Sequence, residues 1–211
     1  MAPSPSAEYD LDARRALLGI ARDAIRVGLR RFGVADARSV VDLDGLKPEL
    51  VQPRATFVTL TQDGSLRGCT GSLEAIRPLA LDVIENACHS AFRDPRFTPV
   101  RVGELDGLRI ELSVLSPLEP LPVSSEAELL ERLEPSMGLV IEEGSRRGTF
   151  LPKVWESLPD PRMFVDELKA KAGFSPGYWS AAVEVFSYRT QTFAEPAPPS
   201  AFAVSRDEES V

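Results

Sequence analysis

The amino-acid sequence predicts an α+β fold in which helices flank a mixed, largely antiparallel sheet. Residues 54–61 and the segment from Leu66 onward flank an Asp63-Gly64 turn signal, as the two strands of a β-hairpin do. Residues 108–115 alternate apolar and polar side chains, which is typical of a strand with one solvated face. Helical and strand patterns alternate irregularly along the chain, and this favours antiparallel pairing over a doubly wound parallel sheet.

The N-terminal quarter of the chain predicts one long helix and a loop. Residues 1–9 are expected to form a disordered leader. Apolar residues at helical spacing then predict a helix over residues 11–29, with Asp10 as its N-cap and Gly33 as its end. Residues 34–53 are expected to be a connecting loop that leads into the hairpin.

A second helix should follow the hairpin. Pro78 suits its first turn, and Pro95 disfavours helical geometry at Asp94, so the helix should end near Phe92. The remaining expected elements are a helix at 124–133, strands at 138–142 and 147–151, a helix at 161–172, a last strand at 183–193 and a disordered acidic tail at 196–211.

The composition narrows the class of protein. The 211 residues include 24 Lys and Arg against 32 Asp and Glu, and the net charge of −8 argues against a general nucleic-acid binder. Cys69 and Cys88 are too few for a disulfide framework, and the first residues lack the pattern of a signal peptide. No apolar segment approaches the ~18 residues of a membrane span. We therefore expect a cytoplasmic protein that binds neither nucleic acid nor membrane.

The hexapeptide at residues 66–71, Leu-Arg-Gly-Cys-Thr-Gly, is the stretch most suggestive of chemistry. Two glycines weaken a strand unless the chain bends or another group approaches the backbone closely. Arg67 should share a face of a regular strand with Cys69, and a neighbouring guanidinium favours the thiolate form. The pattern predicts either a reactive or ligand-contacting cysteine or a small residue buried in a tightly packed sheet.

A second charged segment follows the helix that is expected to end near residue 92. Arg93, Asp94 and Arg96 lie between two aromatic residues, where they could bind an anion or form a structural ion-pair network. His89 is the single histidine of the chain, so a multi-histidine metal site is excluded and we expect no metal. It is the candidate general base for Cys69.

Five motifs in order resemble those of the AMMECR domain family. The hexapeptide is similar to the LRGCIG sequence of that family, with Thr70 in place of isoleucine. The added hydroxyl needs a hydrogen-bond partner if it is buried. The other motifs lie at residues 91–97, 110–116, 148–154 and 171–174, and a Tyr-Trp pair follows at 178–179, so that the resemblance covers roughly residues 10–195.

The resemblance implies one domain with a larger and a smaller subdomain and with the hexapeptide near the cleft between them. It implies no established reaction or cofactor. Members are often encoded with a Memo-like protein and a radical S-adenosylmethionine enzyme, a grouping called the AmmeMemoRadiSam system, in which this chain looks like protein A.

Three functions remain open at this point. One is an enzyme with Cys69 as nucleophile and His89 as base. Another is a module that binds a small molecule or a peptide, and the third is a non-catalytic scaffold or adaptor. The expected ligand-binding residues are Arg67, Gly68, Thr70, Gly71, Arg93, Asp94 and Arg96.

Overall fold

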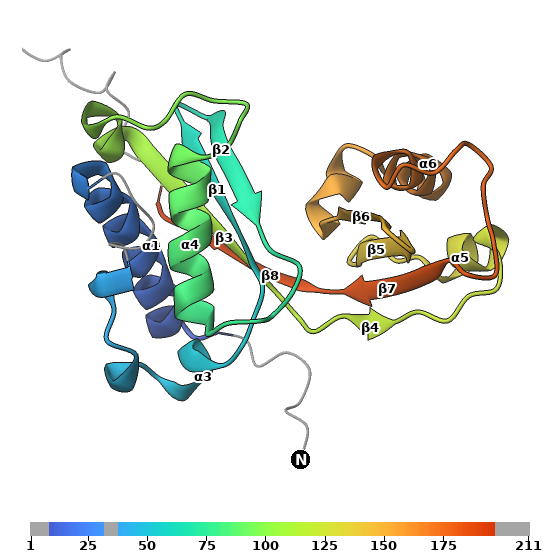
Figure 1. Cartoon of the computed structure of the whole chain (residues 1–211), viewed down its shortest axis with the longest axis horizontal. Coiled ribbons are helices and arrows are strands. Elements are labelled where there is room, and N and C mark those ends of the chain that lie inside the picture. Colours follow the sequence, from blue (N-terminus) through green and yellow to red (C-terminus); the bar gives the residue numbers. More distant parts are fainter. Residues whose placement is uncertain (1–8, 32–37, 197–211) are drawn as a thin grey trace, which may run out of the picture. The chain divides into compact units, whose positions relative to one another are not determined.

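The computed structural model describes residues 9–31 and 38–196, which form two compact units (Figure 1). The first comprises the described residues of Tyr9–Val114 together with residues 192–196, and we call it the cysteine unit because it holds both cysteines. The second, Leu115–Gln191, holds both tryptophans and is called the tryptophan unit. The predicted leader (residues 1–8) and acidic tail (197–211) lie outside the described residues, as does Gly33. The cleft implied by the resemblance stays a prediction.

The cysteine unit is a four-stranded sheet with two long helices on one side (Figure 1). The strands lie in the order β2-β1-β3-β8, and β1 pairs antiparallel with both of its neighbours. The bounds are α1 (Leu11–Arg31), β1 (Thr56–Gln62), β2 (Ser65–Gly71), α4 (Leu79–Phe92), β3 (Leu108–Leu115) and β8 (Thr190–Ala194). Short helical turns complete the unit: η1 (Arg38–Val40), η2 (Leu43–Gly45), α3 (Pro48–Val51) and η3 (Val102–Gly107), so the described part of the expected 34–53 loop is partly helical.

Local signals in the cysteine unit act as the sequence predicts. The Asp10 carboxylate accepts the N–H of Ala13 at 2.7 Å and caps α1. The hairpin turn places Asp63 and Gly64 at positive φ, as a tight two-residue turn requires. Tyr9, which the expected leader includes, is buried in the core, so the folded unit begins at least one residue earlier than expected.

Strand alternation divides the sheet of the cysteine unit into two faces. Val58 and Leu60 of β1 are fully buried in the cluster that also contains the apolar residues of α1 and α4. Their β2 partners, Thr70 and Gly68, point to the same side. Residues between them, such as Cys69, point to the opposite side, which we call the helix-free face because, among the described residues of this unit, both long helices pack on the other side.

The tryptophan unit has its own sheet and core. Its strands lie in the order β4-β7-β5-β6, and all three pairings are antiparallel. The ring of Phe164 stacks on Trp155 with centroids 3.9 Å apart, and buried Lys169 forms an ion pair with Glu126. The bounds are β4 (Glu119–Pro120), α5 (Glu126–Arg132), β5 (Gly138–Glu143), β6 (Arg146–Phe150), η4 (Pro152–Glu156), α6 (Pro161–Lys171) and β7 (Glu184–Tyr188).

The last strand expected at 183–193 is in fact two strands that belong to different sheets. β7 pairs with β4 and β5, whereas β8 lies beside β3. The break falls at Arg189, whose N–H donates to the Ser116 hydroxyl at 3.0 Å and whose carbonyl accepts the Ser116 N–H at 2.9 Å. Pairing with two different neighbours ends one ladder and starts the next, although the strand-forming pattern of the sequence continues.

No helix within the described ranges is long and apolar enough to cross a membrane.

Candidate functional site

The two glycines of the hexapeptide allow other groups to approach β2 closely. A Cβ atom built on Gly68 would lie 2.1 Å from the carbonyl oxygen of Ser90 in α4. A Cβ on Gly71 would lie 2.3 Å from the ring of Phe57. Neither position can hold a side chain without a backbone or ring shift, which confirms close approach as the reason for the glycines. These two residues therefore shape the strand and offer no side chain to a ligand.

Between the glycines, both the N–H and the carbonyl of Cys69 are bonded to side chains of the loop after α4. The Asp94 carboxylate accepts the Cys69 N–H at 2.9 Å, and the Arg96 guanidinium donates to the Cys69 carbonyl at 3.1 Å. Because β2 is an edge strand, these side chains take the place of a neighbouring strand at this residue. The cysteine backbone is thus fixed on its outer side as well as by its pairing with β1.

An ion pair completes this clamp, by which we mean Asp94, Arg96 and the Cys69 peptide. Two bonds of 2.9 and 2.7 Å join the Asp94 carboxylate to the Arg96 guanidinium, and the Arg96 N–H donates to it at 3.1 Å. The Asp94 side chain is 3% exposed, while that of Arg96 is 54% exposed. Hydrogen bonds from Arg96 and then from the Cys69 N–H hold the pKa of the Asp94 carboxyl well below its usual value. Asp94 is therefore a charged hydrogen-bond acceptor with its oxygens already engaged.

The Cys69 side chain points to the helix-free face. Its sulfur lies 3.4 Å from the hydroxyl of Thr59, the residue opposite it on β1. Thr59 in turn pairs with Glu111 on β3, so these side chains form a row across three strands on one face. All three are half-buried. We call them the Cys69 row.

Arg67 does not share this row, contrary to the expectation from a regular strand. Leu60 pairs with Gly68 and Thr61 with Leu66, so Arg67 is the additional residue of a β-bulge. The bulge breaks the two-residue alternation that would have placed Arg67 beside the cysteine.

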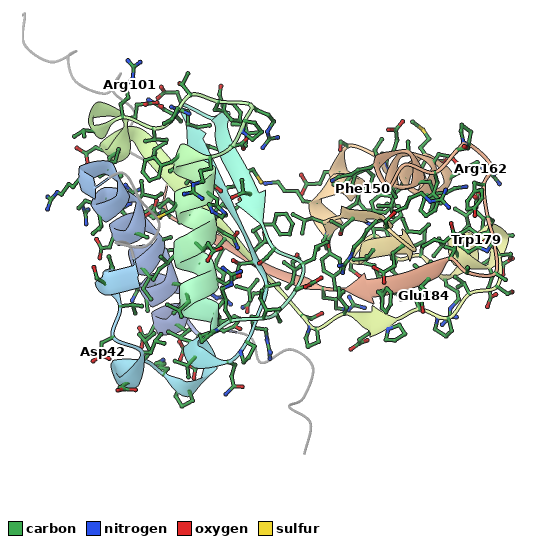
Figure 2. All side chains as sticks on the ribbon, viewed as in Figure 1. Asp42, Arg101, Phe150, Arg162, Trp179 and Glu184 are labelled. Atoms are coloured by element: carbon green, nitrogen blue, oxygen red, sulfur yellow. The ribbon has the colours of Figure 1, made fainter. Side chains whose placement is uncertain are left out.

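The guanidinium of Arg67 is instead bound to the segment that ends in η3. It donates to the Glu104 carboxylate at 2.7 and 3.2 Å and to the Thr98 carbonyl at 2.8 Å. The ion pair with Arg67 lowers the pKa of Glu104, which also accepts the N–H of Arg101, labelled in Figure 2, at 2.8 Å. Arg67 therefore holds this segment against β2.

His89 is not brought to the cysteine either. It lies on α4, which packs on the face to which Gly68 and Thr70 point, while Cys69 points to the other face. Burial lowers the pKa of the half-buried His89 imidazole. The geometry does not support His89 as a general base for Cys69, because the sheet separates the two side chains. Arg93, the C-cap residue of α4, is exposed.

A buried polar seam between α4 and the hairpin escaped the sequence analysis. Asp82, Asn86 and Ser90 recur every four residues and so lie on one face of the helix. Asp82 accepts the N–H and hydroxyl of Thr56 at 2.8 and 2.7 Å, and the Ser72 hydroxyl at 2.8 Å. Burial raises the pKa of the Asp82 carboxyl, against the effect of these donors. The four-residue spacing of Asp82, Asn86 and Ser90 along the helix was the available signal.

The hydroxyl that distinguishes Thr70 from isoleucine joins this seam. It donates to the Asn86 carbonyl at 3.1 Å and lies 2.9 Å from the Ser90 hydroxyl. The Thr70 N–H also donates to Ser90 at 2.9 Å. The hydroxyl thus has the partners that burial requires, and it faces the helix and not the Cys69 row.

No set of three or more His, Cys, Asp or Glu side chains in residues 9–31 and 38–196 is arranged to hold a metal ion. The structure instead contains an α+β unit whose edge strand turns the Cys69 side chain toward a polar face of the sheet. The backbone of Cys69 is held by the side chains of Asp94 and Arg96.

Comparison with known proteins identifies the family to which this arrangement belongs. The AMMECR1 family model matches residues 18–193, and the chain belongs to that family. A protein of Methanothermobacter thermautotrophicus is 38% identical over 192 residues, which cover 87% of this chain and 95% of the relative. Protein MJ0810 of Methanocaldococcus jannaschii is 37% identical over 185 residues, which cover 79% of this chain and 90% of the relative.

A solved structure has the same fold. The crystal structure of the uncharacterised protein PH0010 from Pyrococcus horikoshii superposes with a TM-score of 0.77 at 32% sequence identity. The match covers 87% of this chain and 91% of that chain. The predicted family and the predicted α+β class are both confirmed.

Proposed function

We propose that this protein is the small-ligand-binding component of a modification system and that Cys69 is the side chain that meets the ligand. The clamp on the Cys69 peptide is the observation that carries this proposal. A buried carboxylate and a guanidinium fix one cysteine of an edge strand at both its N–H and its carbonyl. Functional side chains need support of this kind, since a contact group must be held close to its productive geometry.

The direction of the thiol supports the same proposal. A cysteine with a purely packing role would point into the helix-covered core, as Cys88 does at 0% exposure. Cys69 points to the helix-free face, where the Thr59 hydroxyl lies beside the thiol and Glu111 follows on the next strand. A small number of polar groups that converge around one contact residue is typical of a small-ligand site.

Binding is favoured over nucleophilic catalysis by the same geometry. A catalytic thiol needs a base within hydrogen-bond reach. The expected base, His89, belongs to the helix on the other face of the sheet. The thiol instead approaches the hydroxyl of Thr59, which is no general base at neutral pH.

The system itself is proposed from the family resemblance. We expect a Memo-like protein and a radical S-adenosylmethionine enzyme to act with this chain, which would present a small molecule or a peptide to them. A scaffold acting only through protein contacts is the alternative, and it would not need the Cys69 side chain.

Alkylation of the native protein tests the proposal. Iodoacetamide should label Cys69 in the folded protein, and peptide mass spectrometry assigns the site. Cys88 should react only after unfolding, since it is fully buried and burial raises the pKa of its thiol to about 11. A small-molecule extract of the source cells should slow the labelling of Cys69. A Ser145→Cys variant supplies the matched control, because this exposed loop thiol should react at the same rate with and without the extract.

Two results would contradict the proposal. Labelling of Cys69 only after unfolding would show that it is a packing residue. Equal labelling with and without extract, together with full retention of the Memo-like and radical enzymes by Cys69→Ser in a pull-down, would make the protein a scaffold.

A further inference from the structure

The charged side chain that reaches the Cys69 thiol is Arg96. Its guanidinium donates to the Cys69 carbonyl at 3.1 Å, and the Asp94 carboxylate and, more weakly, the Cys69 side chain raise the pKa of Arg96. Glu111, on the same face of the sheet, lies two strands away from the cysteine and already has an interaction partner. A ligand that contacts the thiol therefore meets a guanidinium first.

The Arg96 guanidinium is held in one position by its neighbours. Its Nε donates to the Asp94 carboxylate at 2.9 Å, and its Nη2 donates to the same carboxylate at 2.7 Å. The guanidinium carbon also lies 5.5 Å from the centroid of the Phe97 ring. These contacts restrict a long and otherwise flexible side chain, so the guanidinium is placed before any ligand arrives.

One nitrogen of this guanidinium is left for a ligand. Nη1 carries two N–H groups and donates to no oxygen of the described residues, 9–31 and 38–196. The Arg96 side chain is 54% exposed, whereas that of Asp94, which balances its charge, is 3% exposed. The solvent side of the clamp is therefore a cationic donor, and the carboxylate lies beneath it with its oxygens engaged.

Arg67 does not supply a second free guanidinium. It donates two hydrogen bonds to Glu104 and one to the Thr98 carbonyl, and its side chain is 14% exposed. A doubly charged phosphate is bound best where several cations or N–H donors converge. A single guanidinium edge matches an oxygen group with one negative charge.

We infer that the ligand group beside Cys69 is a carboxylate or another singly charged oxyanion, bound by Nη1 of Arg96. This inference rests on the proposed function, because it names the ligand group that meets Cys69. The sequence left two roles open for the segment after α4, anion binding and a structural ion-pair network. Arg96 serves both: Nε and Nη2 hold the network, and Nη1 binds the ligand.

Two thiol reagents of nearly the same shape test this without knowledge of the natural ligand. Iodoacetate has a carboxylate where iodoacetamide has a neutral amide, and with both reagents the thiolate displaces iodide and forms an S–CH₂ bond. Their rates at Cys69 are measured on the native full-length protein at low salt and are divided by their rates with 2-mercaptoethanol. Peptide mass spectrometry separates Cys69 from Cys88.

Iodoacetate should be preferred after this normalisation. Its carboxylate would lie about 5 Å from the guanidinium carbon and a few ångströms farther from Asp94, which should change the ratio of the two rates about twofold or more. About 0.5 M NaCl should weaken the preference, because it screens charges over a few ångströms.

Variants assign the preference to Arg96. Arg96→Gln should abolish it, but this change also leaves Asp94 unpaired. The double variant Asp94→Asn/Arg96→Gln has the net charge of the wild type and should bring the ratio close to one. Arg30→Gln, at an exposed position of α1 on the helix-covered side, makes the same charge change as Arg96→Gln and should retain the preference. Loss of the clamp alone would not change the ratio, because both reagents attack the same sulfur.

The outcomes separate the inference from the function on which it rests. Equal normalised rates in the wild type, or a preference for iodoacetamide, would overturn the inference and leave an accessible Cys69, even if the variants did not fold. A preference that survives in the double variant, or that Arg93→Gln removes and Arg96→Gln does not, would also overturn it. Absence of labelling by either reagent before unfolding would overturn the proposed function itself.

Discussion

Replacing Asp94 by asparagine removes the charge of the clamp while nearly keeping its shape. The Asp94 carboxylate accepts three kinds of donor: the Cys69 N–H, the Arg96 N–H and the Arg96 guanidinium. An amide has one oxygen and turns an NH₂ group toward whichever donor that oxygen does not meet. The N–H of either Cys69 or Arg96 must therefore lose its partner in Asp94→Asn.

The loss of stability in Asp94→Asn depends on which donor loses its hydrogen-bond partner. A buried backbone N–H without a partner costs about 1–3 kcal/mol. Arg96 adds little, because its side chain is 54% exposed and can turn to water when the ion pair is lost. We therefore expect a loss of about 1–3 kcal/mol in the free energy of unfolding, or roughly 2–10 °C in Tm for a chain of this size.

Two measurements report this change at different levels. Urea denaturation followed by circular dichroism gives the loss in stability, and hydrogen exchange at the Cys69 amide should become faster in Asp94→Asn. The difference between wild type and variant should also depend on pH. Folding lowers the pKa of Asp94, so the stability that this carboxylate contributes is fully present above the pKa of the group in the unfolded chain, about 4. That stability is lost as the pH falls through the lower pKa of the folded state.

Asp44→Asn makes the same chemical change at an exposed position of the cysteine unit and should leave both measurements unchanged. The reasoning would be refuted if Asp94→Asn melted like the wild type and its Cys69 amide exchanged at the wild-type rate. Asp94 would then be free to act as a ligand contact, as the sequence first indicated.

Three further perturbations test other parts of the fold. Gly68→Ala should destabilise the protein by several kcal/mol in thermal melts or prevent folding, because the new Cβ would lie 2.1 Å from a backbone oxygen of α4. Gly19→Ala is the control: it lies on an exposed helix face with nothing within 4 Å and should stabilise the protein by up to about 1 kcal/mol. Glu195→Gln should lower Tm, since this carboxylate pairs with a guanidinium of α1 and accepts a backbone N–H of β3. Deletion of residues 1–8 and 197–211 should change neither the melting temperature nor the proteins recovered in a pull-down, and a shift of more than a few degrees would show that an end docks on the core.

The parts of the fold that the sequence predicted well are those decided by neighbours along the chain. Asp160 caps α6 by accepting the Met163 N–H at 2.9 Å, and Ser125 caps α5 by accepting the Glu128 N–H at 3.2 Å. Pro95 ends α4 at Phe92, as steric exclusion at the preceding residue requires. Such interactions span a few residues, so the residue types alone decide them.

The candidate site shows where this local reasoning fails. The sequence indicated that Arg67, Asp94 and Arg96 matter near Cys69, but not which charges would pair. Glu104, the partner of Arg67, lies 37 residues away and has no local feature that marks it. A bulge at Arg67 breaks the alternation from which the sequence placed the arginine beside Cys69, and a bulge depends on how one strand pairs with the next.

The sequence by itself determined the family, the α+β class, the hairpin and the segments that carry the site. These follow from short motifs and from periodicity, which depend on covalent geometry and on side-chain size. Only the tertiary structure decided that residues 183–193 serve two sheets, that His89 and Cys69 face opposite sides of one sheet, and that the arginines hold the frame. Pairing between strands and between charges is a competition among distant partners, and its outcome depends on which of them the fold brings within a few ångströms.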